Sequence, residues 1–213
     1  MTGIVSIRSG GILSVTSGVV SVAPTRSFAT WNTLDATASV IFSNGNLTVG
    51  ETGSSFQSVR ATRNDLTSGK HYWEVTLNLG AGNDSIVGIR IDSDPISNIW
   101  TTGTHCSFRT GGSYFVGGGA VASGTPVVTN NNDVVMFALD LDNDRLWVGL
   151  NGTWNTAGAN PETNTNPDFD TLPDVTWAPY WSSDNIGNTT QVTANFGATA
   201  FAYTVPVGFN AGV

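Results

Sequence analysis

Acidic side chains are the first candidates for chemistry in this sequence. Asp140, Asp142 and Asp144 alternate like the first ligands of a calcium-binding loop. That loop needs glycine at its sixth position and glutamate at its twelfth, where this sequence has Arg145 and Asn151. The alternation therefore predicts a turn rather than a calcium site.

The two histidines and the single cysteine are His71, His105 and Cys106. Neighbouring residues on a strand point to opposite faces, so His105 and Cys106 would not form a nucleophilic pair there. A zinc site would need more ligands than these three residues, unless carboxylates joined them. We therefore expect Cys106 to be a buried structural residue, and we expect no metal and no cofactor.

Paired carboxylates would point to glycoside hydrolysis, which needs two acids close together. The only glutamates are Glu51, Glu74 and Glu162, and no Glu-x-Asp-x-x-Glu strand occurs. The sequence also has no Gly-x-Ser-x-Gly elbow and no Walker A loop. It therefore predicts no catalytic residues and a protein that is not an enzyme.

The elements that would position a site are β-strands. Runs rich in Val, Ile, Thr and aromatic residues are separated by Gly, Asn, Asp and Ser, and no segment keeps a helical period. Residues 71–77 predict one strand, and residues 134–140 and 145–150 predict a hairpin with its turn at 141–144. The pattern predicts an all-β protein in which two antiparallel sheets pack as a sandwich.

The charge of the chain excludes several partners. The 213 residues carry a formal net charge of -8, only 11% are charged, and Lys70 is the single lysine. Such a chain cannot bind nucleic acid through its phosphates or lie on an anionic membrane through basic charge. No apolar run approaches the roughly 20 residues that span a bilayer, and no signal-peptide pattern opens the sequence. We therefore expect no nucleic-acid partner, no membrane insertion and synthesis in a host cytoplasm.

The first 24 residues contain a repeat of their own. Units of glycine, two branched aliphatics, serine and a β-branched residue begin at Gly3, Gly11 and Gly18. One interpretation is a three-stranded meander packed on the main domain. The other is an assembly arm that pairs with other copies or with a partner's sheet edge, because short apolar strands need a cover. The arm prediction divides the chain into residues 1–24 and 25–213, and the aliphatic candidates for assembly are Ile4, Ile7, Ile12, Val15, Val19 and Val22.

From Trp31 onward the sequence resembles a SPRY domain, the core of the B30.2 module. The resemblance is carried by SGKHYWEVTL at 68–77, NDVVMFALDLDNDRLWVGLNGTWN at 132–155, PYWS at 179–182 and the N-F-G, F-x-Y and P-x-G-F motifs within 195–209. The opening WNTLDATASVIFSNGNLTV resembles the form common in bacterial and phage versions. The resemblance implies a bent sandwich of two antiparallel sheets. It also implies a non-catalytic recognition scaffold whose ligands contact loops at one end.

Three loop-like regions are predicted, at residues 98–114, 117–132 and 153–177. Exposed aromatic and amide side chains suit sugar stacking, and they equally suit protein contact or a place in the core. The candidate recognition residues in or beside these loops are Trp100, Tyr114, Trp154, Asn155, Trp177 and Trp181.

These patterns together favour a structural or recognition component of a phage particle. The phage-like SPRY form, the charge-poor composition and the N-terminal repeat support a capsid decoration, head-fibre or tail-fibre subunit. Its arm would anchor it to capsid or tail proteins or to other copies, and its location would be the virion. The alternatives are a glycan-binding module for a host surface and an intracellular peptide-binding adaptor.

Overall fold

The computed structural model describes residues 13–16, 19–22, 27–51, 56–78, 85–96, 104–116, 119–123, 130–183 and 190–213. Every regular element in these ranges is a β-strand, which confirms the all-β prediction. Within the same ranges there is no helix of the length and apolarity that a membrane crossing requires.

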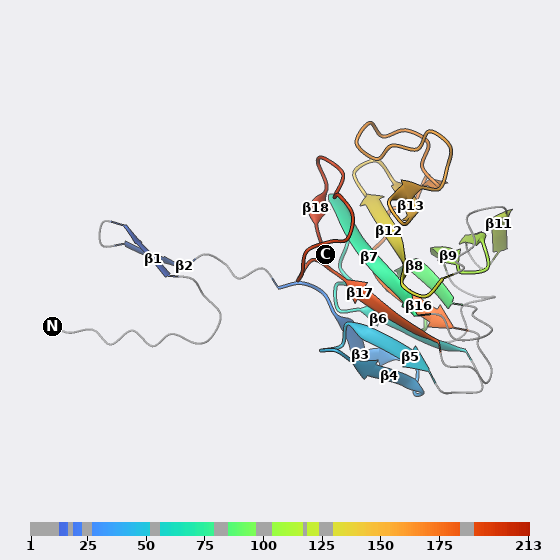
Figure 1. The fold of residues 1–213 in the computed structure, drawn as a ribbon, viewed down its shortest axis with the longest axis horizontal. Coiled ribbons are helices and arrows are strands. Elements are labelled where there is room, and N and C mark those ends of the chain that lie inside the picture. The colour runs from blue at the N-terminus through green and yellow to red at the C-terminus, as the bar shows by residue number, and fades with distance from the viewer. Residues whose placement is uncertain are drawn as a thin grey trace.

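Two large sheets form the sandwich (Figure 1). The first sheet has seven strands in the order β11-β10-β9-β8-β16-β6-β3, and neighbouring strands are antiparallel. Its strands are β3 (Trp31–Ala36), β6 (Gln57–Ala61), β8 (Ser85–Ile91), β9 (His105–Arg109), β10 (Ser113–Val116), β11 (Gly119–Ser123) and β16 (Trp177–Ser183).

The second sheet has nine strands and the main order β14-β13-β12-β7-β17-β5-β4. Off this path, β15 pairs with β13, and β18 pairs with β7 in the only parallel pairing among the described strands. Its strands are β4 (Val40–Ser43), β5 (Thr48–Glu51), β7 (Lys70–Asn78), β12 (Asp133–Asp140), β13 (Arg145–Leu150), β14 (Thr153–Trp154), β15 (Phe169–Asp170), β17 (Gln191–Asn195) and β18 (Asn210–Ala211).

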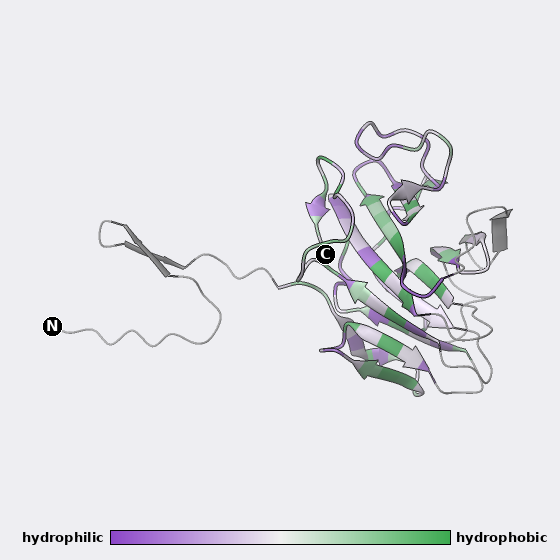
Figure 2. Ribbon diagram, viewed as in Figure 1, coloured by the Kyte–Doolittle hydropathy of each residue, from purple (hydrophilic) through white to green (hydrophobic). Residues whose placement is uncertain are grey.

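The main core lies between the two sheets, where their inward side chains meet. Trp73 on β7 stacks on Phe137 of β12 with 5.0 Å between ring centroids, and Trp31 meets Phe196 edge-on at 5.1 Å. Figure 2 shows the hydrophobic colouring that runs along β12, whose eight residues are all buried. Large buried aromatic rings such as these contribute much of the apolar area that stabilises a sandwich.

The predicted hairpin is confirmed as β12 and β13, which pair from Val135 with Leu150 to Asp140 with Arg145. Asp140 closes the turn, because its Oδ1 accepts the backbone N–H groups of Asp142 and Asn143 at 3.1 and 3.2 Å. Its Oδ2 forms an ion pair with the Lys70 ammonium at 2.8 Å. The alternating aspartates are therefore a turn motif, as the sequence predicted.

The second large sheet also has a partly covered outer face, opposite the main core. A smaller apolar cluster lies there, made of Tyr72, Met136, Ala138, Trp147 and Phe209. Side chains from the loop after β13 and from the C-terminal segment pack against it: Trp154, Ala159, Phe201, Tyr203 and Val205. Two segments far apart in sequence thus meet on one face of the sheet (Figure 1).

The N-terminal repeat is described in part. Strands β1 (Leu13–Thr16) and β2 (Val19–Val22) form a two-stranded antiparallel sheet, with Leu13 opposite Val22. The second and third repeat units therefore pair with each other. Ile4, Ile7 and Ile12 lie outside the described residues, and the division of the chain at residue 24 stays a prediction.

The loop prediction for residues 98–114 is wrong over its second half. Residues from His105 to Val116 form β9 and β10, with Phe108 opposite Tyr114 and Ser107 opposite Phe115. Pairing of β9 with β8 and of β10 with β9 stabilises these strands despite the many Ser, Thr and Gly residues nearby.

Candidate functional site

A row of side chains crosses the outer face of the second sheet from β7 to its edge. Glu74, Met136, Gly149 and Trp154 are successive cross-strand partners on β7, β12, β13 and β14. Gly149 has no side chain, and a Cβ there would collide with Met136 Cε and lie 3.0 Å from Trp154 Cε3. The glycine therefore leaves room for the Met136 thioether and the Trp154 ring to come together on this face of the sheet.

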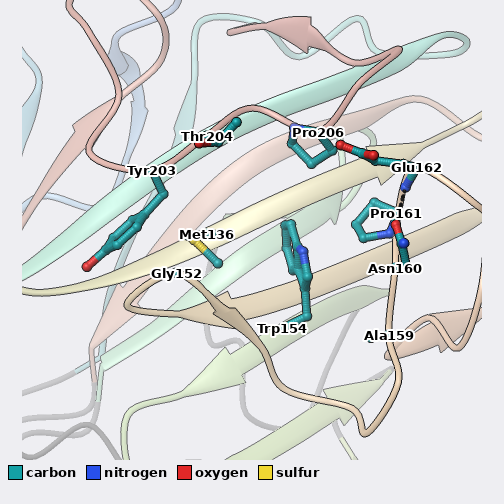
Figure 3. A pocket seen from close by; sticks show the side chains of 10 residues that line it. All are labelled: Met136, Gly152, Trp154, Ala159, Asn160, Pro161, Glu162, Tyr203, Thr204 and Pro206. Carbon is teal, nitrogen blue, oxygen red and sulfur yellow. Dashed lines mark hydrogen bonds between the residues drawn. The ribbon is translucent and has the colours of Figure 1, made fainter.

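Met136 and Trp154 form the floor of a groove of about 410 Å³, hereafter the outer-face groove (Figure 3). Its volume lies within the range of roughly 300–1,000 Å³ that is typical of small-ligand sites. The lining combines aromatic, proline and polar side chains: Met136, Gly152, Trp154, Ala159, Asn160, Pro161, Glu162, Tyr203, Thr204 and Pro206.

One wall of the groove is the loop that follows β14. Trp147 Nε1 donates to the carbonyl of Thr165 at 2.8 Å and so holds this loop against the sheet. Asn160 accepts the backbone N–H of Glu162 through its Oδ1 at 2.9 Å, in a tight polar turn. The loop thereby presents Asn160, Pro161 and Glu162 to the groove.

The other wall is the segment around Tyr203, and Glu74 positions it. The Glu74 side chain is 3% exposed. Its Oε2 accepts the N–H of Ala202 at 2.8 Å, and its Oε1 accepts the N–H of Tyr203 at 2.9 Å and the hydroxyl of Tyr72 at 2.8 Å. The buried Glu74 carboxylate thus holds the backbone of this segment against β7.

A second carboxylate joins the two walls at the rim. Glu162 accepts the backbone N–H of Val207 through Oε1 at 2.9 Å. Glu162 and Thr204 are exposed, and Trp154 and Tyr203 are partly exposed, so the groove opens to solvent. Each wall is thus fixed by hydrogen bonds to a carboxylate, which makes the groove preformed.

Several polar groups in the groove have no hydrogen-bond partner within the described part of the chain. They are Asn160 Nδ2, Glu162 Oε2, Thr204 Oγ1, Trp154 Nε1 and Tyr203 Oη. Together they offer donors, an acceptor and hydroxyls beside apolar surface, which is the usual chemistry of a ligand site.

Of the predicted recognition residues, only Trp154 lies in this groove. Trp177 and Trp181 are both 0% exposed on β16, so their rings are core residues and cannot contact a ligand; that prediction is wrong. The two tryptophans are four residues apart on a strand and both point into the core. Trp100 lies outside the described residues.

Tyr114 and Asn155 belong to a buried polar cluster around Asp168 rather than to an exposed recognition surface. Tyr114 Oη donates to Asp168 Oδ1 at 2.8 Å and accepts from Asn155 Nδ2 at 2.6 Å. Asp168 also accepts the Thr156 hydroxyl at 2.7 Å and the Val148 N–H at 2.6 Å. Burial raises the pKa of Asp168 above its ordinary value, although these hydrogen bonds act in the opposite direction.

The histidines and the cysteine have structural surroundings. Cys106 is a free, buried thiol on β9, and burial raises its pKa to about 12. His105 Nδ1 lies 2.9 Å from Ser107 Oγ and 3.1 Å from Tyr180 Oη, on the face of β9 opposite Cys106. Among the residues that the structure describes, no group of three or more His, Cys, Asp or Glu side chains could hold a metal ion.

Most residues of the groove were not foreseen from the sequence. Asn160, Glu162, Tyr203 and Thr204 lie on two segments about forty residues apart in the chain, and only the fold brings them together. The one local signal was the Asn- and Pro-rich composition of residues 153–177, a region that supplies half of the groove lining.

Comparisons with known proteins agree on the fold. No protein-family model matches the chain, and no curated protein matches it. The structure is similar to the SPRY domain of human HERC1, with a TM-score of 0.60 and 17% identity, covering 76% of this chain and 96% of that chain. It is also similar to the TRIM65 PSpry domain, with a TM-score of 0.55 and 15% identity, covering 79% and 92% of the two chains.

Stonustoxin is a third similar structure, with a TM-score of 0.58 and 18% identity, covering 79% of this chain and 27% of that much longer chain. The chain therefore has the SPRY fold, two antiparallel sheets in a sandwich, as its motifs predicted. Its resemblance to bacterial and phage versions stays a prediction.

Proposed function

We propose that the protein is a non-enzymatic recognition protein whose SPRY sandwich binds its target in the outer-face groove. The observation that carries the proposal is the set of unpartnered polar groups beside exposed aromatic surface, on walls that hydrogen bonds hold in place. A preformed concave site of this composition favours binding, because little ordering entropy is lost when the ligand enters.

The lining of the groove does not favour catalysis. Glu162 is its single carboxylate, and the ten lining residues include no His, Cys, Ser or Lys. General acid–base hydrolysis of a glycoside uses two carboxylates, and nucleophilic catalysis uses a nucleophile beside a base. A binding role needs neither arrangement.

The binding proposal is tested by screening the full chain against a random-peptide display library and a glycan array. Ligands from either library should bind the wild type and Leu34→Ala, whose substituted side chain is 96% exposed on β3 of the other sheet. They should bind Trp154→Ala at least about tenfold more weakly, as expected when a central aromatic contact is removed. Ligands that bind Trp154→Ala as well as wild type, or no ligand in either library, would contradict the proposal.

We also propose that the protein is a component of a phage virion. In this proposal, the N-terminal repeat anchors the SPRY domain to the particle. The support is the repeat itself and the pairing of its second and third units as β1 and β2. A two-stranded sheet alone is only marginally stable in water, so an assembly partner that adds strands would stabilise it.

Deletion of residues 2–23 tests this anchoring role. Light scattering should show that the full chain self-associates and that the deletion variant is monomeric. The circular dichroism spectrum of the variant should still be that of a folded β-sandwich. Labelled antibody on purified particles should detect the full chain and not the variant. Equal assembly and equal attachment of both chains would contradict the anchoring proposal and leave the groove proposal intact.

A further inference from the structure

We propose that the outer-face groove binds an uncharged sugar residue of a glycan, with the sugar stacked on Trp154 and hydrogen-bonded by Asn160, Glu162 and Thr204. This inference rests on the proposed function and names the ligand class for the same site. It follows from four properties of the groove: its rings, its free side-chain groups, its occupied backbone and its charge.

The rings supply the stacking surface. Trp154 lies on the floor beside Met136, and Tyr203 lies over Gly152 on the opposite wall (Figure 3). Pro161 and Pro206 add two further apolar faces. The C–H groups on one face of a pyranose carry partial positive charge, so they are attracted to the negative face of an indole or phenol ring.

The free polar groups match hydroxyl groups. Asn160 Nδ2 is a donor, Glu162 Oε2 is an acceptor, and Thr204 Oγ1 can act as either. The structure describes no partner for any of the three, although Oδ1 of Asn160 and Oε1 of Glu162 each accept a backbone N–H at 2.9 Å. A sugar hydroxyl is both donor and acceptor, so it can bond with all three groups.

The backbone of the two walls argues against an extended peptide. The N–H groups of Asn160, Glu162, Tyr203 and Val207 all donate within the protein, at 2.9 to 3.0 Å. Pro161 and Pro206 have no N–H to offer. A peptide that binds by strand addition needs such backbone donors. Of the two wall segments, Thr204 is the lining residue whose N–H has no such bond in the described part of the chain, and one donor cannot hold an added strand. A ligand that pairs mainly with side chains is therefore favoured over one that pairs with the main chain.

The charge of the groove selects among sugars. Glu162 is the only ionisable side chain in the lining besides the Tyr203 phenol, and no Lys, Arg or His lines it. The whole chain carries a formal net charge of -8. A sialic acid, uronic acid or sulfated sugar would meet like charge with no cation to compensate it. The structure therefore favours a neutral hexose or N-acetylhexosamine.

The test uses the full chain on a glycan array that carries neutral, uronate-bearing and sialylated oligosaccharides, beside the random-peptide library. Wild type and Leu34→Ala should bind neutral glycans, and Trp154→Ala should lose about tenfold or more in affinity. Glu162→Gln keeps an oxygen for the Val207 N–H and removes the charge. It should therefore bind the neutral glycan more weakly and the uronate-bearing glycans more strongly than wild type does.

Thr204→Val gives a second test in case Trp154→Ala does not fold, because it removes one exposed hydroxyl group and no packing contact. It should lower the affinity for the neutral sugar several-fold while its melting temperature stays that of wild type. The NMR signal of the Trp154 indole N–H can be assigned because it is missing from the spectrum of Trp154→Phe. Titration of the neutral sugar into the wild type should shift this signal.

Three results would overturn the inference: a preference for acidic glycans, no bound glycan, or neutral-glycan binding that all groove variants retain. Peptide ligands alone, lost in Trp154→Ala, would overturn the sugar inference and leave the binding proposal standing. Ligands that bind every groove variant as tightly as the wild type would contradict both the sugar inference and the binding proposal.

Discussion

The hydroxyl of Tyr114 donates a 2.8 Å hydrogen bond to Oδ1 of Asp168 and so joins the two sheets at one end of the sandwich. Tyr114 lies on β10 of the first sheet, whereas Asp168 precedes β15 and bonds to Val148 on β13 of the second sheet. The Tyr114 ring also meets Phe169 edge-on at 5.3 Å. The pair, hereafter the clasp, is therefore a polar link between the two sheets beside the apolar core.

Tyr114→Phe should destabilise the protein by about 1–3 kcal/mol, because the ring stays but Asn155 Nδ2 loses its acceptor and Asp168 loses a donor. Urea unfolding followed by tryptophan fluorescence measures the change. Tyr203→Phe is the matched control, since no described residue bonds to its hydroxyl; its effect should stay within about 0.5 kcal/mol. Equal effects of the two variants would contradict the clasp.

Cys106 should be unreactive in the folded protein. Its thiol is 3% exposed, and burial raises its pKa to about 12, so almost no thiolate exists at mildly alkaline pH. Iodoacetamide labelling followed by mass spectrometry should modify it only after denaturant is added. Labelling of the folded chain at the rate of a free cysteine would show that β9 opens readily.

Gly152→Ala should cost more than Gly45→Ala, although both glycines follow an asparagine in a turn and have positive φ, +84° and +61°. A Cβ at Gly45 meets nothing within 4 Å, so that variant carries only the backbone cost of about 1–2 kcal/mol. A Cβ at Gly152 would lie 2.8 Å from the Tyr203 ring, which adds about 1–3 kcal/mol or displaces the ring. The free energies of unfolding of the two variants measure the difference. Equal values would contradict the position of the Tyr203 ring beside Gly152.

Glu74→Gln should loosen the segment that carries Tyr203. An amide has one oxygen, so at least one of the three donors that bond to Glu74 would face an N–H group. The expected loss in the free energy of unfolding is about 1.5–3 kcal/mol. Amide hydrogen exchange at Ala202 and Tyr203 should become faster than in the wild type, whereas exchange in the strands should change little. Glu162→Gln is the control, because one amide oxygen is enough to accept the single hydrogen bond from the Val207 N–H. It should leave the exchange at Ala202 and Tyr203 nearly unchanged.

The sequence predicted the parts of the fold that have strong local patterns. The strands around Trp73 and Phe137 alternate or run apolar, and the turn at Asp140 has clear turn residues, so they could be placed without a structure. Strand β10 could not, because Ser113 and its glycine neighbours favour a loop until β9 pairs with them. Long-range pairing decides such segments.

The candidate site was less predictable for the same reason. Trp177 and Trp181 looked like loop aromatics, yet every residue of β16 is buried, so no polar alternation marks it as a strand. Trp154 does line the groove, but its surroundings depend on the neighbouring Gly149 and Met136 and on Tyr203 of the other wall. Those neighbours are set by register and by the path of the last segment, which no local pattern contains.

Covering the outer face of β7 and β12 and building the groove are one folding step. The Tyr203 segment follows in sequence the strands that it covers, and its later residues bind back through the Gly212 N–H, which donates to Tyr72 O at 2.9 Å. Until this segment docks, the apolar side chains of Tyr72, Met136 and Trp147 lack part of their cover. Docking completes the groove and covers these residues together, so ligand binding reports that this face of the sheet has folded.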